Sequence, residues 1–240
     1  MFRFFRQTRK DQLMPDKTRK YLLYAVGEIL LVVIGILIAL QVNNWNEERK
    51  MQTTETSLLN DLKSNLAANF AEIESALDFN RETLDNYEII LRYVEQDLPQ
   101  DSTLNAAFFT FSNWAAPYFA RSAYESLKSR GLDNLKNAEL RAALTAMYDE
   151  RFTHLTNDYD RAEWQLSSEV RIEFVKKYVR YLQDDTAIVI NYKEMISDDE
   201  FENALRFTMR FRRWGVDVLS QALVEIDNLI ELIDSELENR

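Results

Sequence analysis

Cysteine is absent from this 240-residue chain, and histidine, proline and glycine are scarce, at one, three and four residues. The lack of cysteine excludes disulfides, thiolate metal sites and cysteine nucleophiles. A single histidine excludes most histidine-based zinc sites and leaves few schemes of acid–base catalysis. Glycine and proline together lie far below their roughly 12% of average usage, which argues against sandwiches, barrels and glycine-loop nucleotide folds. The composition therefore predicts long helices and gives no sign of a cofactor.

Charge is distributed unevenly along the chain. Residues 1–20 carry seven basic and two acidic side chains, residues 21–42 carry only Glu28, and residues 43–240 carry 22 basic and 37 acidic side chains. The acidic region repels nucleic-acid phosphates, so nucleic acid is not expected as a partner.

Residues 21–42 form an apolar stretch with the length of a membrane span. As a helix it is about 33 Å long, and the hydrocarbon core of a bilayer is about 30 Å thick. The basic segment before it predicts a cytoplasmic N-terminus and a periplasmic C-terminal domain. A cleaved signal peptide and a buried soluble helix are the competing interpretations. The stretch is longer than a usual signal-peptide core, however, and no typical cleavage site follows it.

Aromatic and basic residues flank this stretch. Tyr21 and Tyr24 at one end and Trp45 at the other fit interfacial anchors. Near the N-terminus, Arg3 and Arg6 alternate with phenylalanines, a pattern that is attracted to anionic lipid headgroups. A topology signal alone explains the same pattern. In either case, membrane lipids are the expected surroundings.

Glu28 is an ionisable residue inside the predicted span, where such residues are costly and often functional. At 100° per residue, Gly35 and Ala39 each lie about 20° from Glu28 around the helix. Small residues four apart allow transmembrane helices to approach closely. We expect this face to contact another transmembrane helix, either in a second copy or in another membrane protein. The alternative is a partly protonated carboxyl near the headgroups with no partner.

The run from Lys20 to Glu47, KYLLYAVGEILLVVIGILIALQVNNWNE, resembles an uncharacterised family of single-pass inner-membrane proteins from Bacteroidota. Residues 122–131 (SAYESLKSRG) and 137–141 (NAELR) also resemble that family. The resemblance implies a short basic segment, a span, an α-helical region and a Gram-negative envelope. It implies no biochemical activity.

Two stretches repeat apolar residues in steps of four and three, the pattern of a coiled-coil-like seam. They predict helices over residues 45–98, ended by Pro99, and over residues 198–239, started by Ser197 as cap. Asn80 and Arg212 are the polar exceptions; such residues often fix register or oligomeric state, although partial exposure explains them equally. The seam positions are Leu66, Phe70, Ile73, Leu77, Asn80, Leu84, Tyr87, Leu91, Val94 and Leu98, and Leu205, Met209, Arg212, Val216, Leu219, Leu223, Ile226, Ile230, Ile233 and Leu237.

Three further helices are predicted between the seams. They span residues 102–115, 118–130 and 134–182, with Asp101 opening the first and Gly131 ending the second in a left-handed cap. The β-branched stretch at residues 186–192 is expected to be a loop or a short irregular element. The predicted fold is thus all-α: an N-terminal basic segment (1–20), one transmembrane helix (21–42) and an elongated antiparallel helical bundle (43–240).

An aromatic block spans the end of the first of these helices and the start of the second. It suggests either the packed cap of the bundle or a ligand or partner site. Its members are Phe108, Phe109, Phe111, Trp114, Tyr118, Phe119 and Tyr124.

No pattern of metal-ligating or catalytic residues stands out. His154 follows Glu150 by four residues, but the chain has no second histidine to complete a metal site. No P-loop, Rossmann fingerprint or nucleophile elbow is present. We therefore expect a non-enzymatic protein that mediates interaction or assembly at the periplasmic face of the inner membrane. The alternative is a ligand-sensing or accessory subunit of a membrane signalling or transport complex.

Overall fold

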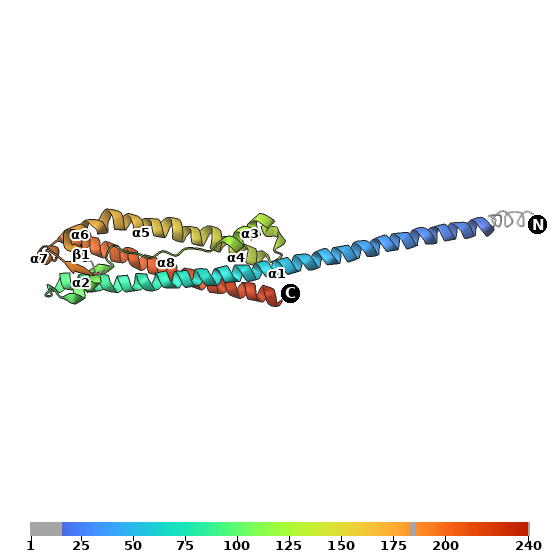
Figure 1. Cartoon of the computed structure of the whole chain (residues 1–240). Helices are drawn as coiled ribbons and strands as arrows, with labels where there is room; N and C mark the ends of the chain where they lie inside the picture. The colour runs from blue at the N-terminus through green and yellow to red at the C-terminus, as the bar shows by residue number, and fades with distance from the viewer. Residues whose placement is uncertain (1–15, 183–185, 240) are drawn as a thin grey trace, which may run out of the picture. The chain divides into compact units, whose positions relative to one another are not determined.

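The computed structural model describes residues 16–182 and 186–239, which fall into two compact units (Figure 1). The first unit ends at Glu55 and the second begins at Thr56. Helix α1 (Asp16–Gln96) contributes to both. The fold is all-α, as predicted, apart from two short strands in the described part of the chain.

The first unit is the N-terminal part of α1, and its apolar side chains are uncovered. Every side chain from residue 19 to residue 54 is exposed. Within this part, an 18-residue window has a mean hydropathy of 2.6. A helix of this length and composition is able to cross a membrane.

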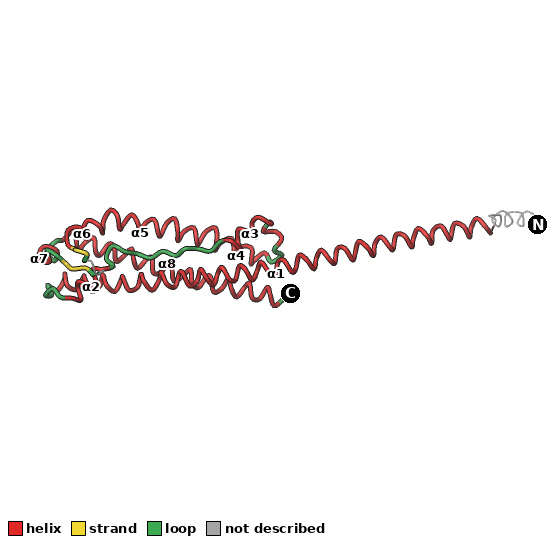
Figure 2. The backbone as a smooth tube through the Cα atoms, viewed as in Figure 1, coloured by secondary structure: helices red, strands yellow, loops and turns green. Residues whose placement is uncertain are grey.

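The second unit is a bundle of three long helices (Figures 1 and 2). Residues 56–96 of α1 lie beside α8 (Asp199–Glu238), which runs in the opposite direction. The third long helix, residues 138–178, alternates α and π turns: α4 (Ala138–Thr145), η3 (Ala146–Arg151), η4 (His154–Asp160), α5 (Arg161–Leu166), η5 (Ser167–Arg171) and α6 (Ile172–Tyr178).

The third long helix is shorter than the predicted range 134–182. It starts at Ala138 because the Asn137 side chain accepts a hydrogen bond from the Leu140 amide at 3.1 Å and caps the first turn. A 3-10 turn precedes it at η2 (Leu132–Asn134). It ends at Tyr178 because the chain continues as a strand.

The β-branched stretch near residue 187 forms a strand where a loop or irregular element was expected. Strand β2 (Ala187–Val189) pairs antiparallel with β1 (Val179–Tyr181). The outer edge of β2 is covered, because the Val189 amide donates to Asn105 at 2.8 Å and Gln100 donates to the Val189 carbonyl at 2.7 Å. Helix α7 (Tyr192–Met195) then leads to α8.

The two helices predicted around the aromatic block are also shorter than expected. Helix α2 (Ser102–Phe109) stops six residues before position 115, and α3 (Ser122–Arg130) starts four residues after position 118. The predicted cap Asp101 is confirmed, since its carboxylate accepts from the amides of Thr103 and Leu104. Gly131 follows the last residue of α3 with a positive φ of 95°, as a left-handed cap requires, but its ψ of 119° lies outside the left-handed helical region.

The start of α8 differs by one residue from the prediction. Its cap is Asp198 and not Ser197, because the Asp198 carboxylate accepts from the Glu200 and Phe201 amides at 3.0 and 3.2 Å. The same carboxylate also accepts hydrogen bonds from Lys177 and Tyr178, so it lies at the junction between α6 and α8.

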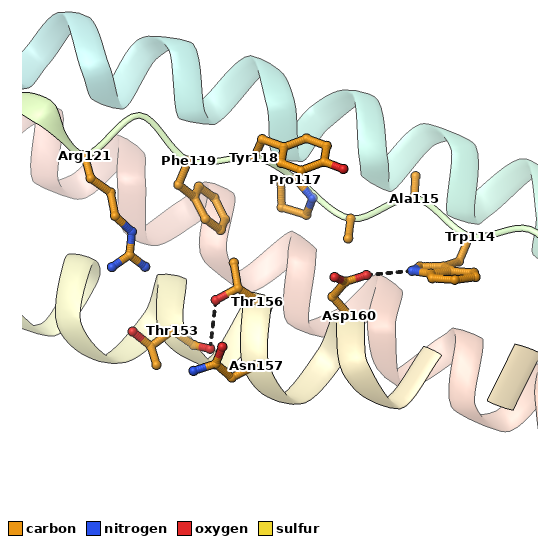
Figure 3. A pocket seen from close by; sticks show the side chains of 11 residues that line it. Trp114, Ala115, Pro117, Tyr118, Phe119, Arg121, Thr153, Thr156, Asn157 and Asp160 are labelled. Atoms are coloured by element: carbon orange, nitrogen blue, oxygen red, sulfur yellow. Dashed lines mark hydrogen bonds between the residues drawn. The ribbon is translucent and has the colours of Figure 1, made fainter. Parts of the chain in front are cut away.

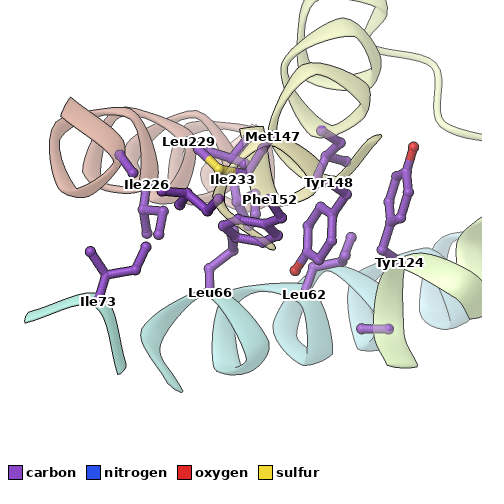
Figure 4. Close-up of a cluster of buried hydrophobic side chains, with 14 of the residues drawn as sticks. Leu62, Leu66, Ile73, Tyr124, Met147, Tyr148, Phe152, Ile226, Leu229 and Ile233 are labelled. Carbon is purple, nitrogen blue, oxygen red and sulfur yellow. The ribbon is translucent and has the colours of Figure 1, made fainter. Parts of the chain in front are cut away.

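The core of the second unit covers the apolar seam positions within one chain. Leu66, Ile73 and Tyr87 of α1 and Leu219 and Ile226 of α8 are fully buried. The other apolar seam residues are buried or pack partly buried against one of two core clusters. Figure 4 shows α1, α8 and the third long helix all contributing side chains to the first cluster. These apolar positions therefore need no second copy to cover them.

Candidate functional site

Residues 113–121 form an extended segment that connects α2 to α3 and belongs to no helix or strand (Figure 2). Pro117 lies near its middle and is buried. A proline and its preceding residue both disfavour helix, which explains why the predicted helices stop short of this segment. Its backbone polar groups therefore need partners outside regular secondary structure.

Two fully buried asparagines of α1 bind this backbone. Asn69 donates to the Ala120 carbonyl at 3.1 Å and accepts from the Ala120 amide at 2.7 Å. Asn80 donates to the Ala115 carbonyl at 2.9 Å and accepts from the Ala115 amide at 3.4 Å. Each carboxamide thus satisfies a donor and an acceptor of one residue, as a neighbouring β-strand would.

The spacing of the two asparagines sets the conformation of the segment. Asn69 and Asn80 are 11 residues apart on α1, a rise of about 16.5 Å. Their targets Ala115 and Ala120 are five residues apart, which spans about 16.5 Å only when the chain is extended. The two asparagines can therefore be satisfied together only by an extended chain.

A buried ionic cluster lies beside this segment and joins the third long helix to α8. It consists of Glu163, Arg171 and Arg212, none of which has any exposed surface. The Glu163 carboxylate is 2.9 Å from a terminal nitrogen of Arg171 and 3.3 Å from one of Arg212. Two guanidiniums share one carboxylate, so the cluster leaves one positive charge in the interior.

The two predicted seam exceptions meet in this cluster. Arg212 donates to the Asn80 side chain and, at 2.9 Å, to the Asn113 carbonyl. The Tyr87 hydroxyl lies 3.5 Å from both arginines and donates to the Phe111 carbonyl at 2.7 Å. A direct bond between α1 and α8 at these positions is what a register role requires; that role stays a prediction.

The aromatic block does not form a single patch. Phe108 and Phe111 are buried in one core cluster, and Tyr124 is buried in the other. Phe109 is exposed beside Tyr181, with ring centroids 6.5 Å apart. Its remaining three members, Trp114, Tyr118 and Phe119, lie on the extended segment.

Those three residues line a groove between the extended segment and η4, with a cavity volume of about 720 Å³ (Figure 3). Tyr118 is 86% exposed, whereas the Phe119 ring stacks on Phe152 with centroids 4.0 Å apart. At one end, Trp114 donates to the Asp160 carboxylate at 2.8 Å. At the other end, Arg121 points toward the η4 side of the groove.

In the first unit, the predicted membrane residues lie on an uncovered helix. Glu28, Gly35 and Ala39 are exposed, as are the flanking Tyr21, Tyr24 and Trp45. A Cβ added at Gly35 would meet nothing within 4 Å. Arg3 and Arg6 lie outside the described residues.

Four residues with buried or close contacts have no signal in the sequence patterns: Glu163, Arg171, Asn69 and Gly215. Eight residues separate Glu163 from Arg171, which on an ideal α-helix places them about 80° apart. The π turn η5 lies between them and takes in an extra residue, which reduces that angle to about 20°. The residues between them are mostly polar (Gln165, Ser167, Ser168 and Glu169), so no local pattern marks this pair.

Within the described residues, no group of three or more histidine, aspartate or glutamate side chains could hold a metal ion. The His154 ring lies 2.7 Å from the carboxylate of Asp158. Its acidic neighbour is therefore Asp158 and not Glu150. The site therefore consists of a groove, its extended segment and the buried cluster behind them.

Comparison with known proteins gives one match. No curated protein and no solved structure matches the chain. Residues 28–211 match the model of a family described as DUF6090, of unknown function. This match takes in residues 28–42 of the apolar stretch, the extended segment and the whole third helix. Since it covers more than half of the sequence, the protein belongs to the DUF6090 family.

Proposed function

We propose that this protein is held in the inner membrane by residues 21–42, with a cytoplasmic N-terminus and a periplasmic second unit. In this proposal it mediates protein–protein interaction or assembly and carries out no catalysis. The observation that carries it is the uncovered apolar surface of the first unit. A helix from a soluble core would have its apolar side chains buried, whereas those of residues 21–42 are all exposed. Exposed apolar surface of this extent is stable in lipid and not in water.

The face around Glu28 is the assembly surface in this proposal. The apolar seam residues of the second unit are covered within the chain, so they leave no seam for another copy. Gly35 and Ala39 flank Glu28 within about 20° and allow a neighbouring helix to approach closely. A carboxyl on that face can then bond across the interface, which offsets its cost in lipid.

Topology is testable by thiol labelling, because the natural chain contains no cysteine. We expect an impermeant maleimide applied to spheroplasts to label a Ser129→Cys protein and not a Gln7→Cys protein. Ser129 is exposed in the second unit. Labelling of Gln7→Cys, or release of the chain from membranes by an alkaline wash, would contradict the proposed anchor.

Assembly is testable by crosslinking in native membranes. We expect Glu28→Leu combined with Gly35→Leu to remove the crosslinked complex. Gly27→Leu is the matched control, because it makes the same glycine-to-leucine change about 80° from Gly35 and about 100° from Glu28 around the helix, and a Cβ there also meets nothing within 4 Å. An unchanged complex in the double variant would rule out this face as the contact.

A ligand-sensing or accessory role is the second candidate, and the groove beneath Tyr118 favours it. A cavity of about 720 Å³ lies within the range of small-molecule sites, which is roughly 300–1,000 Å³. The test is purification of the full chain from its own membranes in mild detergent, with mass spectrometry of small molecules and proteins that remain bound. A chain that carries neither would argue against both roles.

A further inference from the structure

The groove between the extended segment and η4 has one polar end and one aromatic wall. Arg121, Thr153 and Asn157 lie at the polar end, while Tyr118 and Phe119 form the wall (Figure 3). In the described chain, the side chains of Arg121 and Asn157 make no hydrogen bond or ion pair. A half-buried guanidinium presents several N–H donors in a fixed planar arrangement that matches a carboxylate.

The carboxylate nearest to this groove is already engaged. Asp160 accepts from the Trp114 indole at 2.8 Å, at the opposite end of the groove from Arg121. Arg121 therefore has no acidic partner among the described residues, although the chain as a whole is strongly acidic.

The charges behind the groove add to this local positive character. The Arg171 guanidinium lies 5.9 Å from the centre of the Trp114 ring, on the buried side. Its cluster with Glu163 and Arg212 carries one uncompensated positive charge. Asp160 adds one negative charge at the Trp114 end of the groove, where its partner is the neutral indole. The buried cluster offsets that charge, because charges act over longer distances where water is excluded. Arg121 then favours an anion at its own end of the groove.

The aromatic wall beside the polar end suits a flat apolar group. The Tyr118 ring is almost fully exposed, and Phe119 is held against Phe152 by stacking. Aromatic rings pack well against other planar or apolar groups. The site thus combines a carboxylate-binding arginine with an apolar surface a few residues away.

We propose that this groove binds a carboxylate attached to an aromatic or apolar body, with the carboxylate on Arg121 and the body against Tyr118. This inference rests on the second candidate function above. Two sources have this chemistry: a small free acid and the C-terminus of a peptide. Asn157 lines the same groove and has an amide side chain that can bind the second carboxylate oxygen or a neighbouring amide.

The experiment uses the full chain in detergent micelles and measures binding by ligand-observed NMR and calorimetry. The probes are N-acetylphenylalanine and the tripeptide Ala-Ala-Phe, each paired with its C-terminal amide. We expect both acids to bind at least ten times more tightly than their amides. Arg121→Gln should weaken the acids at least tenfold and leave the amides unchanged, while Arg121→Lys should recover part of the loss.

Arg180→Gln is the matched control, because Arg180 is exposed on β1 and does not line the groove. Tyr118→Ala should weaken acids and amides equally. A tighter tripeptide identifies a chain end as ligand, and a tighter small acid identifies a free metabolite; both support the proposal. If acid and amide bind equally, the carboxylate inference is wrong while a ligand site remains. Binding that Arg121→Gln leaves intact, or no saturable binding of either acid, overturns the proposal.

Discussion

Replacing Glu163 with glutamine removes the only carboxylate of the buried ionic cluster. Both guanidiniums, of Arg171 and Arg212, would then lie at 0% exposure without an anion. Breaking a buried ion pair by removing one partner costs about 3–5 kcal/mol, because the remaining charge is uncompensated. For a domain of this size, 1 kcal/mol shifts the melting temperature by about 2–4 °C. We therefore expect Glu163→Gln to lower it by about 6–20 °C.

The two single variants are expected to differ in cost, with Glu163→Gln more destabilising than Arg212→Met. Arg212→Met leaves Glu163 paired with Arg171, so no net charge stays buried. Its cost is about 1–3 kcal/mol, from the acceptors on Asn80 and Asn113 that lose their donor. Combining Glu163→Gln with Arg212→Met should cost less than the sum of the two, since one of the uncompensated charges is removed.

The assay is thermal and urea unfolding of the full chain in mild detergent, followed by far-ultraviolet circular dichroism. Glu169→Gln is the matched control, because it is the same substitution at an exposed position of the same helix; we expect a change within about 0.5 kcal/mol. If Glu163→Gln has the same melting temperature as the control, or if Arg212→Met lowers the melting temperature more than Glu163→Gln does, the electrostatic account of the cluster is refuted.

Three further predictions follow from local contacts. Gly215→Ala should destabilise the second unit by about 1–3 kcal/mol, because the added Cβ would lie 2.5 Å from the Tyr159 ring; stability equal to wild type in urea would contradict the contact. Asn69→Ala should cost about 1–3 kcal/mol by leaving the Ala120 amide and carbonyl without partners, and should raise hydrogen exchange at Ala120. The pKa of Asp198 is lowered to about 2, chiefly by the hydrogen bond from Tyr178. The stability that this carboxylate provides is therefore complete above about pH 4 and is lost as the pH falls toward 2. Asp198→Asn keeps the cap and should flatten the unfolding free energy across that interval; an unchanged pH profile would argue against this source.

The sequence predicted the long elements well because their signals are periodic. The seam positions of α1 and α8 are spaced so that one face is apolar, and those residues are buried or half-buried against the core as that spacing requires. Asn80 and Arg212 stood out as polar interruptions of the two seams, and they hydrogen-bond to each other.

The groove and the ionic cluster were harder to predict, for identifiable physical reasons. π turns shift the angular position of Glu163 relative to Arg171, so regular helical spacing hides their contact. The many aromatic residues before Pro117 favoured a helix there. In the structure, backbone groups of this segment instead hydrogen-bond to side chains of α1 that are far away in the sequence. Such long-range hydrogen bonds leave no local pattern.

The asparagines that bind the extended segment recognise peptide groups and not side chains. In the extended segment, the side chains of Asn69 and Asn80 hydrogen-bond only to the backbone of Ala120 and Ala115. These four hydrogen bonds therefore do not depend on which side chains residues 115 and 120 carry. The position of the segment along α1 is thus set separately from the chemistry of the side chains that it presents to the groove.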